Sequence, residues 1–255
     1  MFLKPKEKKI GLALSGGSTW GMAHIGVLQA LEELDIKVSY ISGTSVGSFI
    51  GALYASGISS TQLERIASSA NWGKFSRPHI SFTGLFSLEP MERFIRKYLK
   101  NPYIENMPLP FCAVATDILS GKEVLFESGY LPTIIRGSCS IPGIFEPVVM
   151  DDMLIVDGGI VNNLPVSANR ALGADFVIGV NLSPEISNFI PHNTVELLIK
   201  TFLVMQNANT LKEAAMADVL IDINPEKISP ADFKSAKELI ALGYERAMYE
   251  LSDQF

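Results

Sequence analysis

Ser45 has the sequence surroundings that most favour chemistry, because it lies between two glycines in Gly43-Thr44-Ser45-Val46-Gly47. The G-x-S-x-G spacing follows an expected strand over residues 38–42 and precedes an expected helix over residues 46–55, which is typical of a nucleophile elbow. The flanking glycines let the chain turn sharply, and the helix aims its N-terminal N–H groups at the serine. The alternative is a strand-to-helix turn in which Ser45 is only a helix N-cap. The pentapeptide alone does not separate the two.

A second glycine-rich segment follows an expected strand over residues 9–14 and opens an expected helix over residues 22–34; it reads Ser15-Gly16-Gly17-Ser18-Thr19-Trp20-Gly21. Its backbone N–H groups can form an anion-binding nest beside the elbow, which suits an oxyanion hole. The competing interpretation is a nucleotide site. The glycines are not spaced G-x-G-x-x-G, however, and Met22 stands where a P-loop has lysine. We therefore expect an oxyanion loop.

A serine hydroxyl is a weak nucleophile, so Ser45 needs a base within hydrogen-bond reach. The three histidines are His24 in a helical pattern, His79 in an irregular segment and His192 in a polar loop. None has a motif of its own, although His192 has the chain order of a Ser-Asp-His triad. Asp157 is the stronger candidate, because it ends an apolar strand and precedes two glycines, a position that points a carboxylate into a crevice at strand ends. The alternative is an aspartate in an Asp-Gly turn.

The elements that position these residues alternate between strand-like and helical patterns along the chain. Further strands are expected at 111–116, 122–126, 153–156, 176–180 and 219–223, and further helices at 89–99, 166–172, 194–216 and 232–251, the last weakened by Gly243. This alternation predicts an α/β protein of three α/β/α layers with a central, mostly parallel sheet. No linker divides the chain, so residues 1–255 are expected to form a single domain.

The composition excludes several functional classes. The 255 residues carry a formal net charge of −6 and include only two cysteines, Cys112 and Cys139. An acidic chain without a basic stripe is a poor nucleic-acid partner. Although 47% of the residues are hydrophobic, none of the apolar runs approaches the roughly 18 residues that span a bilayer. We expect a cytoplasmic protein, with peripheral contact at a membrane as a further expectation, and neither metal nor cofactor.

Taken together, these segments resemble the patatin-like phospholipase family, in particular its compact bacterial members. The resemblance covers about residues 9–182 and includes three further stretches: Ala115-Thr116-Asp117, Ser138-Cys139-Ser140-Ile141-Pro142-Gly143-Ile144-Phe145 and Asn162-Asn163-Leu164-Pro165-Val166. It implies a Ser–Asp dyad in which Asp157 accepts the Ser45 proton, and a lipid or other acyl ester as substrate. Gly16, Gly17 and Ser18 then hold the oxyanion, supported by the glycines of the elbow and loops: Gly43, Gly47, Gly21 and Gly158.

The chain departs from the family pattern at two positions of the oxyanion loop. Ser18 replaces the third of three consecutive glycines, and Trp20 stands where an arginine or lysine is usual. Losing that cation predicts that neutral esters or lysolipids turn over better than anionic phospholipids. Alternatives are a low-activity member with a regulatory role and a triad esterase that uses His192. An irregular segment at about 71–88, rich in aromatic and basic residues, is expected to cap the crevice or to form a satellite cluster.

Overall fold

The computed structural model describes residues 8–79, 81–182, 190–225 and 228–255. Within these ranges the main sheet has eight strands in the order β10-β9-β1-β2-β5-β8-β7, with β6 paired to β5. The strands are β1 (Ile10–Leu14), β2 (Val38–Thr44), β5 (Phe111–Asp117), β6 (Lys122–Phe126), β7 (Val148–Met150), β8 (Met153–Asp157), β9 (Phe176–Asn181) and β10 (Val219–Asp222). The pairs from β10 to β5 are parallel, whereas β6, β7 and β8 pair antiparallel. The expected mostly parallel sheet is confirmed.

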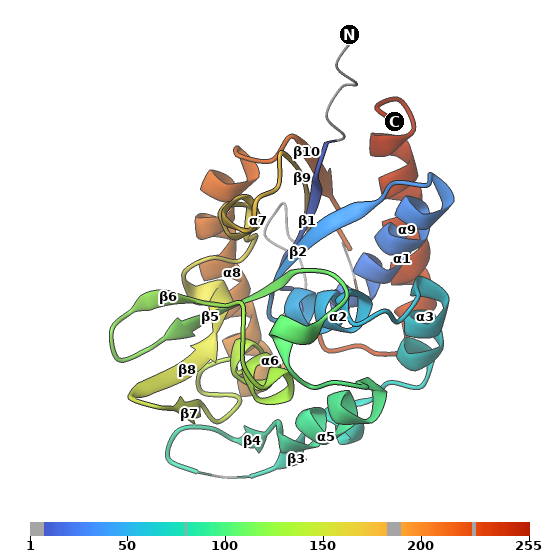
Figure 1. Cartoon of the computed structure of the whole chain (residues 1–255). Helices are drawn as coiled ribbons and strands as arrows, with labels where there is room; N and C mark the ends of the chain where they lie inside the picture. Colours follow the sequence, from blue (N-terminus) through green and yellow to red (C-terminus); the bar gives the residue numbers. More distant parts are fainter. Residues whose placement is uncertain (1–7, 80, 183–189, 226–227) are drawn as a thin grey trace, which may run out of the picture.

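Helices cover both faces of this sheet and complete the three layers (Figure 1). On one side lie α1 (Met22–Glu33), α2 (Val46–Ala55), α3 (Ser60–Ser68) and α9 (Ala236–Leu251); on the other lie α7 (Val166–Leu172) and α8 (Thr194–Ala214). The central strands are therefore shielded from water on both faces. In β5 every residue is buried, including Thr116 and Asp117, as a strand covered on both sides requires.

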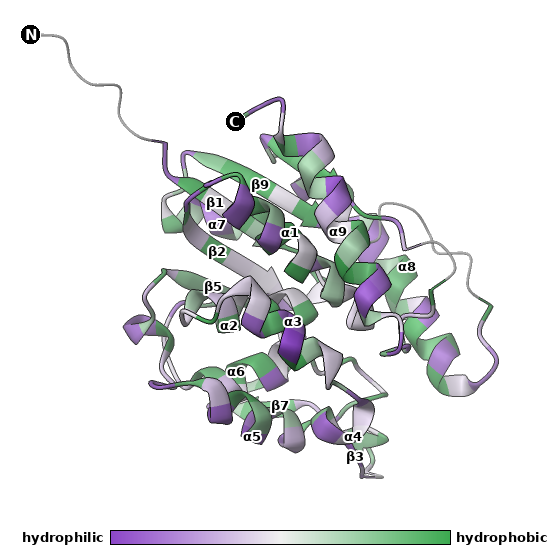
Figure 2. Cartoon of the chain, turned by 90° about the vertical axis from the view of Figure 1, so that its right-hand side faces the viewer, coloured by the Kyte–Doolittle hydropathy of each residue, from purple (hydrophilic) through white to green (hydrophobic). Residues whose placement is uncertain are grey.

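The helices α1 and α9 pack side by side over the sheet (Figure 2). Two glycines make this contact close. A Cβ atom at Gly243 would lie 2.0 Å from the carbonyl oxygen of Ala23, and one at Gly26 would lie 1.9 Å from the carbonyl oxygen of Ile240. The prediction that Gly243 weakens the last helix therefore misses its role, because this residue lets two helix backbones approach.

The segment after α3 forms short elements at one end of the sheet. It comprises α4 (Trp72–Phe75), the two-stranded pair β3 (Arg77–Pro78) and β4 (Phe86–Ser87), then α5 (Glu89–Tyr98). The helix α6 (Leu131–Ser138), which follows β6 in the chain, packs against α5. Phe75 is buried, whereas Phe82 is fully exposed at the tip of the irregular stretch. The base of the stretch therefore packs into the main core and Phe82 is exposed to solvent; its role as a cap stays a prediction.

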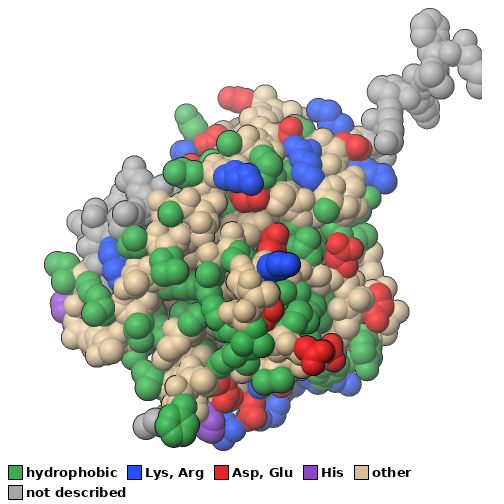
Figure 3. Space-filling view, turned by 90° about the vertical axis from the view of Figure 1, so that its left-hand side faces the viewer, with side chains coloured by type: hydrophobic (Ala, Val, Ile, Leu, Met, Phe, Trp, Pro, Cys, Tyr) green, Lys and Arg blue, Asp and Glu red, His purple; other side chains and the backbone are tan. Residues whose placement is uncertain are grey.

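Apolar side chains also gather on the surface of the face on which α8 lies (Figure 3). The large exposed ones on α8 are Leu197, Val204, Met205 and Leu211. Within the residues that the structure describes, no helix combines the length and the apolar character needed to cross a membrane.

Candidate active site

Ser45 occupies the sharp turn between β2 and α2. Its backbone has φ 53° and ψ −126°, a conformation that is uncommon for a residue other than glycine, and its side chain makes no capping hydrogen bond to the helix. The interpretation as an ordinary N-cap is therefore wrong. Strain of this kind at a turn over-determined by its surroundings is typical of a nucleophile elbow.

Close packing explains why glycines flank the turn. A Cβ at Gly43 would lie 2.5 Å from the carbonyl oxygen of Gly47, and a Cβ at Gly47 would lie 2.2 Å from that of Leu14. The hydroxyl of Ser138, at the end of α6, holds the strained residue by accepting the N–H of Ser45 at 3.0 Å and donating to the carbonyl of Val114 at 2.7 Å. Ser138 therefore ties the elbow to the neighbouring strand.

Asp157 faces Ser45 directly. The Ser45 hydroxyl donates a hydrogen bond of 2.6 Å to Oδ2 of Asp157, and Oδ1 of Asp157 accepts the N–H of Gly159 at 2.9 Å. Both side chains are nearly inaccessible to solvent, since Asp157 is 0% and Ser45 6% exposed. The two residues that were singled out for nucleophile and base are brought together.

The route by which Asp157 reaches this position differs from the expectation. The sequence pattern places it in a crevice at the strand ends of a mostly parallel sheet, but β8 runs antiparallel to β5. Register brings it to Ser45: Asp157 pairs with Ala115, whose neighbour Val114 pairs with Thr44. The carboxylate thus enters from the opposite direction and meets the elbow across one intervening strand. Gly158 allows this approach, because its Cβ would lie 2.4 Å from the carbonyl oxygen of Val114.

Burial changes the acidity of Asp157. Desolvation penalises its charged form and raises the pKa of the carboxyl group from 3.8 to about 7, although the hydrogen bonds from Ser45 and Gly159 oppose the shift. A carboxylate with a pKa near neutrality is matched to proton exchange at the pH of most cells.

The histidines lie in other environments. His24 is fully buried and its Nε2 lies 2.8 Å from the Ser15 carbonyl oxygen, while burial lowers its pKa to about 4. The ring is therefore neutral and must donate to that carbonyl. His79 pairs with Glu146 at 3.3 Å, and His192 is exposed at the start of α8. In the described ranges, no histidine makes a hydrogen bond to Ser45 or Asp157.

The glycine-rich loop lies beside the elbow, as expected. A Cβ on Gly16 would lie 3.2 Å from the Cβ of Ser45, and Val46 packs against Gly21 so tightly that a Cβ there would lie 2.1 Å from its methyl carbon. Gly17 has φ 156° and Ser18 has φ 54°, so Ser18 adopts a left-handed conformation that glycine would enter more easily.

One of the three expected oxyanion donors is already engaged. The N–H of Gly16 donates to Asn163, both to its backbone oxygen at 3.2 Å and to its side-chain Oδ1 at 3.1 Å. The side-chain amide of Asn163 in turn donates to Thr210 of α8 at 3.3 Å. Asn163 lies in one of the motif stretches, but the sequence pattern assigned it no role; the structure gives it the position of a support for the loop.

The side chain of Trp20 is part of the protein interior. It is 1% exposed, and its indole N–H donates to the carbonyl of Ile228 at 2.9 Å. It does not line the cavity at Ser45. The preference for neutral esters, which was drawn from the missing cation at this position, stays a prediction.

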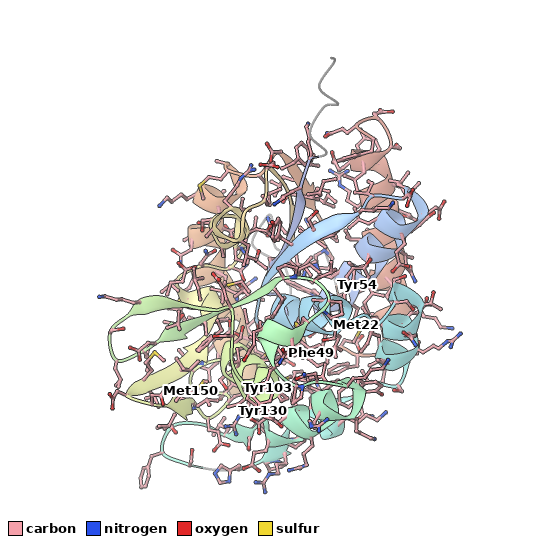
Figure 4. The ribbon with its side chains drawn as sticks, viewed as in Figure 1. Met22, Phe49, Tyr54, Tyr103, Tyr130 and Met150 are labelled. Carbon is pink, nitrogen blue, oxygen red and sulfur yellow. The ribbon has the colours of Figure 1, made fainter. Side chains whose placement is uncertain are left out.

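An apolar cavity extends from Ser45 between α2 and the short elements. Apart from Ser18, Thr19 and Ser45, every lining side chain among the described residues is apolar. Met22 and Phe49, both labelled in Figure 4, belong to this lining. The others are Val46, Ile50, Leu53, Leu63, Ile66, Ala67, Ala70, Trp72, Phe75, Leu88, Met91, Cys139, Ile141, Phe145 and Phe233. A serine that opens onto such a cavity can receive an apolar chain.

The family model described as patatin-like phospholipase matches residues 12–169 of this chain. That range covers most of the chain and contains the elbow, the glycine-rich loop and Asp157. The chain belongs to the patatin-like phospholipase family. This confirms the resemblance drawn from its motifs.

Similar proteins are larger than this patatin-like chain. It is 36% identical to an uncharacterized NTE family protein of Mycobacterium tuberculosis over 184 residues, which are 69% of this chain and 49% of that protein. It is 31% identical to lysophospholipase NTE1 of Mycosarcoma maydis over 238 residues, which are 90% of this chain and 12% of that protein. The chain therefore spans about half the length of the mycobacterial relative and a small part of the fungal one.

Two solved structures share the fold. VipD from Legionella pneumophila superposes with a TM-score of 0.58 at 13% identity, covering 97% of this chain and 67% of VipD. ExoU in its complex with SpcU from Pseudomonas aeruginosa superposes with a TM-score of 0.55 at 18% identity, covering 96% of this chain and 52% of the matched chain. These likenesses confirm the patatin-like fold.

Proposed function

We propose that this patatin-like domain is a lipid acyl hydrolase with a Ser–Asp dyad. The observation that carries the proposal is the 2.6 Å hydrogen bond to the buried carboxylate of Asp157 from the hydroxyl of Ser45, which lines an apolar cavity. Family membership supports the reaction class, and the name of the fungal relative, a lysophospholipase, supports a lipid ester as substrate.

In the proposed reaction, Asp157 Oδ2 accepts the proton of Ser45 while Oγ attacks the ester carbonyl carbon. The carbonyl oxygen gains negative charge and lies against the N–H groups of Gly17 and Ser18, with Gly16 held in place by Asn163. Collapse of this intermediate breaks the ester C–O bond, and the proton on Asp157 passes to the departing alkoxide. Water, deprotonated by Asp157, then releases the acyl group and restores Ser45.

The cavity favours the acyl part of the substrate. Lining residues of α2 run from Val46 to Leu53, which is about 10 Å of helix at 1.5 Å per residue, so several carbons of an acyl chain can lie along this helix. Since no charged side chain is found among the described residues of the lining, none of them compensates the desolvation of an anionic group. We therefore keep the preference for neutral esters and lysolipids, but attribute it to the lining and not to Trp20.

Turnover of a lipid panel tests this function. The purified protein is expected to hydrolyse p-nitrophenyl butyrate and octanoate, and to release fatty acid from monoacylglycerol or lysophosphatidylcholine faster than from phosphatidylglycerol. Hydrolysed fatty acid would be quantified by mass spectrometry, with Ser45→Ala protein as the blank. Turnover that is fastest on phosphatidylglycerol contradicts the preference, and no turnover of any ester contradicts the function.

A further inference from the structure

Consecutive residues in the loop between β10 and α9 accept hydrogen bonds from the oxyanion loop. We call residues 228–233 the strap. The carbonyl of Ile228 accepts the indole N–H of Trp20 at 2.9 Å, that of Ser229 accepts the hydroxyl of Thr19 at 3.4 Å, and that of Pro230 accepts the backbone N–H of Thr19 at 3.1 Å. Three successive carbonyls thus bond to two successive residues of the oxyanion loop.

The next carbonyl of the strap is bound from the other side of the cavity. Ala231 accepts the indole N–H of Trp72, at the start of α4, at 2.9 Å. Both tryptophans of the chain therefore donate their indole N–H to the strap. Since a buried indole N–H without a partner is costly, each bond favours this one position of the loop.

These hydrogen bonds hold the strap where the ring of Phe233 lines the cavity. This ring meets Trp72 edge-on, with centroids 5.1 Å apart, and stacks with Phe75 at 5.8 Å. All three rings line the cavity that begins at Ser45. The strap lies beyond residues 12–169, where the family model matches, so this wall is added by a segment outside the matched range.

We propose that the strap is a specificity element of the acyl site, in which Phe233 limits the length of the acyl chain and Trp20 and Trp72 are positioning residues that hold it there. The proposal rests on the proposed function for its substrate class. It also gives Trp20 a role, that of a buried side chain whose indole N–H holds the strap. An extra methylene in an apolar pocket commonly changes specificity by about tenfold or more, so one ring in the wall is enough to set a length limit.

The test compares Phe233→Ala with the wild type on two readouts. The first is the ratio of kcat/KM for p-nitrophenyl laurate to that for p-nitrophenyl butyrate, measured below the micellar concentration. The second is the ratio of dissociation constants for dodecanol and octanol, followed by tryptophan fluorescence, to which Trp72 in the cavity wall contributes. Phe233→Ala is expected to raise the laurate ratio about tenfold and to shift binding toward dodecanol. Phe233→Leu, which removes less volume, should give a smaller change in the same direction.

Tyr249→Ala is the matched control, because it removes an exposed aromatic ring from α9, the helix that follows the strap. Both ratios should stay at the wild-type value. Unchanged ratios in Phe233→Ala and Phe233→Leu proteins that melt cooperatively would overturn the proposal. If the wild type shows no hydrolysis that depends on Ser45, the proposed function fails while the alkanol ratio still decides whether Phe233 limits chain length.

Discussion

Asp157→Asn is expected to lower kcat/KM for p-nitrophenyl butyrate by about 10²- to 10⁴-fold and, at pH 8, to make the protein more stable. Activity falls because the amide cannot accept the proton of Ser45, with which Oδ2 of the carboxylate now makes a 2.6 Å bond. Stability rises because the substitution removes a charge from a site that is 0% exposed. A substitution that lowers activity and raises stability is typical of a catalytic residue.

The stability gain has a defined pH dependence. The folded-state pKa of Asp157 is about 7, above the ordinary 3.8, so folding penalises the ionised form. Relative to the asparagine variant, the wild type loses stability progressively as pH rises from about 4 to 7, and the deficit is constant above 7. Its upper limit is about 4 kcal/mol, at roughly 1.4 kcal/mol per pKa unit.

Thermal melts of both proteins at pH 5, 6, 7 and 8 measure this difference. The melting-temperature gap should widen toward pH 8 and narrow toward pH 5. His192→Ala is the control for the triad alternative, because His192 is an exposed residue at the start of α8 and should keep wild-type activity. An inactive His192→Ala protein together with an active Asp157→Asn protein would reverse the assignment of the base.

The pH profile of the wild type is expected to be controlled by the same carboxyl group. Only ionised Asp157 can accept the Ser45 proton, and its pKa is about 7. The value of kcat/KM should therefore rise with pH to a plateau above pH 8, with a midpoint near 7. Below it, activity should fall about tenfold per pH unit, so that at pH 5 about one hundredth of the plateau remains.

Release of nitrophenol, followed at a wavelength where its ionisation does not change the absorbance, gives this profile. Circular dichroism at each pH serves as the control that the chain stays folded. A midpoint near 4, the ordinary value for an aspartate, or a flat profile from pH 5 to 8 would show that a buried carboxylate is not the base.

The turn at Ser45 and the facing Asp157 could be predicted from the sequence because short-range patterns encode them. Glycines at positions 43 and 47 mark a turn that only small residues can make, and the acidic residue before Gly158 and Gly159 marks the facing loop. The limits of α2 and α7 follow equally local signals and agree with the expected ranges.

The antiparallel direction of β8 could not be predicted from the sequence, because no short sequence pattern in a strand tells whether its neighbour runs parallel or antiparallel. Likewise, the last helix was expected from Asp232 but begins at Ala236. Residues 232–235 form a local turn instead, in which the carboxylate of Asp232 accepts the N–H of Lys234 at 2.8 Å and the hydroxyl of Ser235 at 2.9 Å. Such side-chain hydrogen bonds compete with the helix over its expected first turn.

The hydrogen bonds that occupy the N–H of Gly16 could not be predicted from the sequence either. A glycine-rich loop predicts free N–H groups, but which of them remain free depends on Asn163, 147 positions later. The burial of Trp20 likewise depends on the strap, which shares no motif with the oxyanion loop. The sequence therefore predicts the reacting pair better than it predicts what surrounds the substrate.

Covalent labelling of Ser45 tests the central claim most directly. An alkyl fluorophosphonate should add once per chain, with the added mass mapped by peptide mass spectrometry to the peptide that contains Ser45. The adduct should be absent from Ser45→Ala and should form much more slowly in Asp157→Asn, because the carboxylate that accepts the hydroxyl proton is gone. Stoichiometric labelling of another residue, or wild-type ester hydrolysis by the Ser45→Ala protein, would contradict the account.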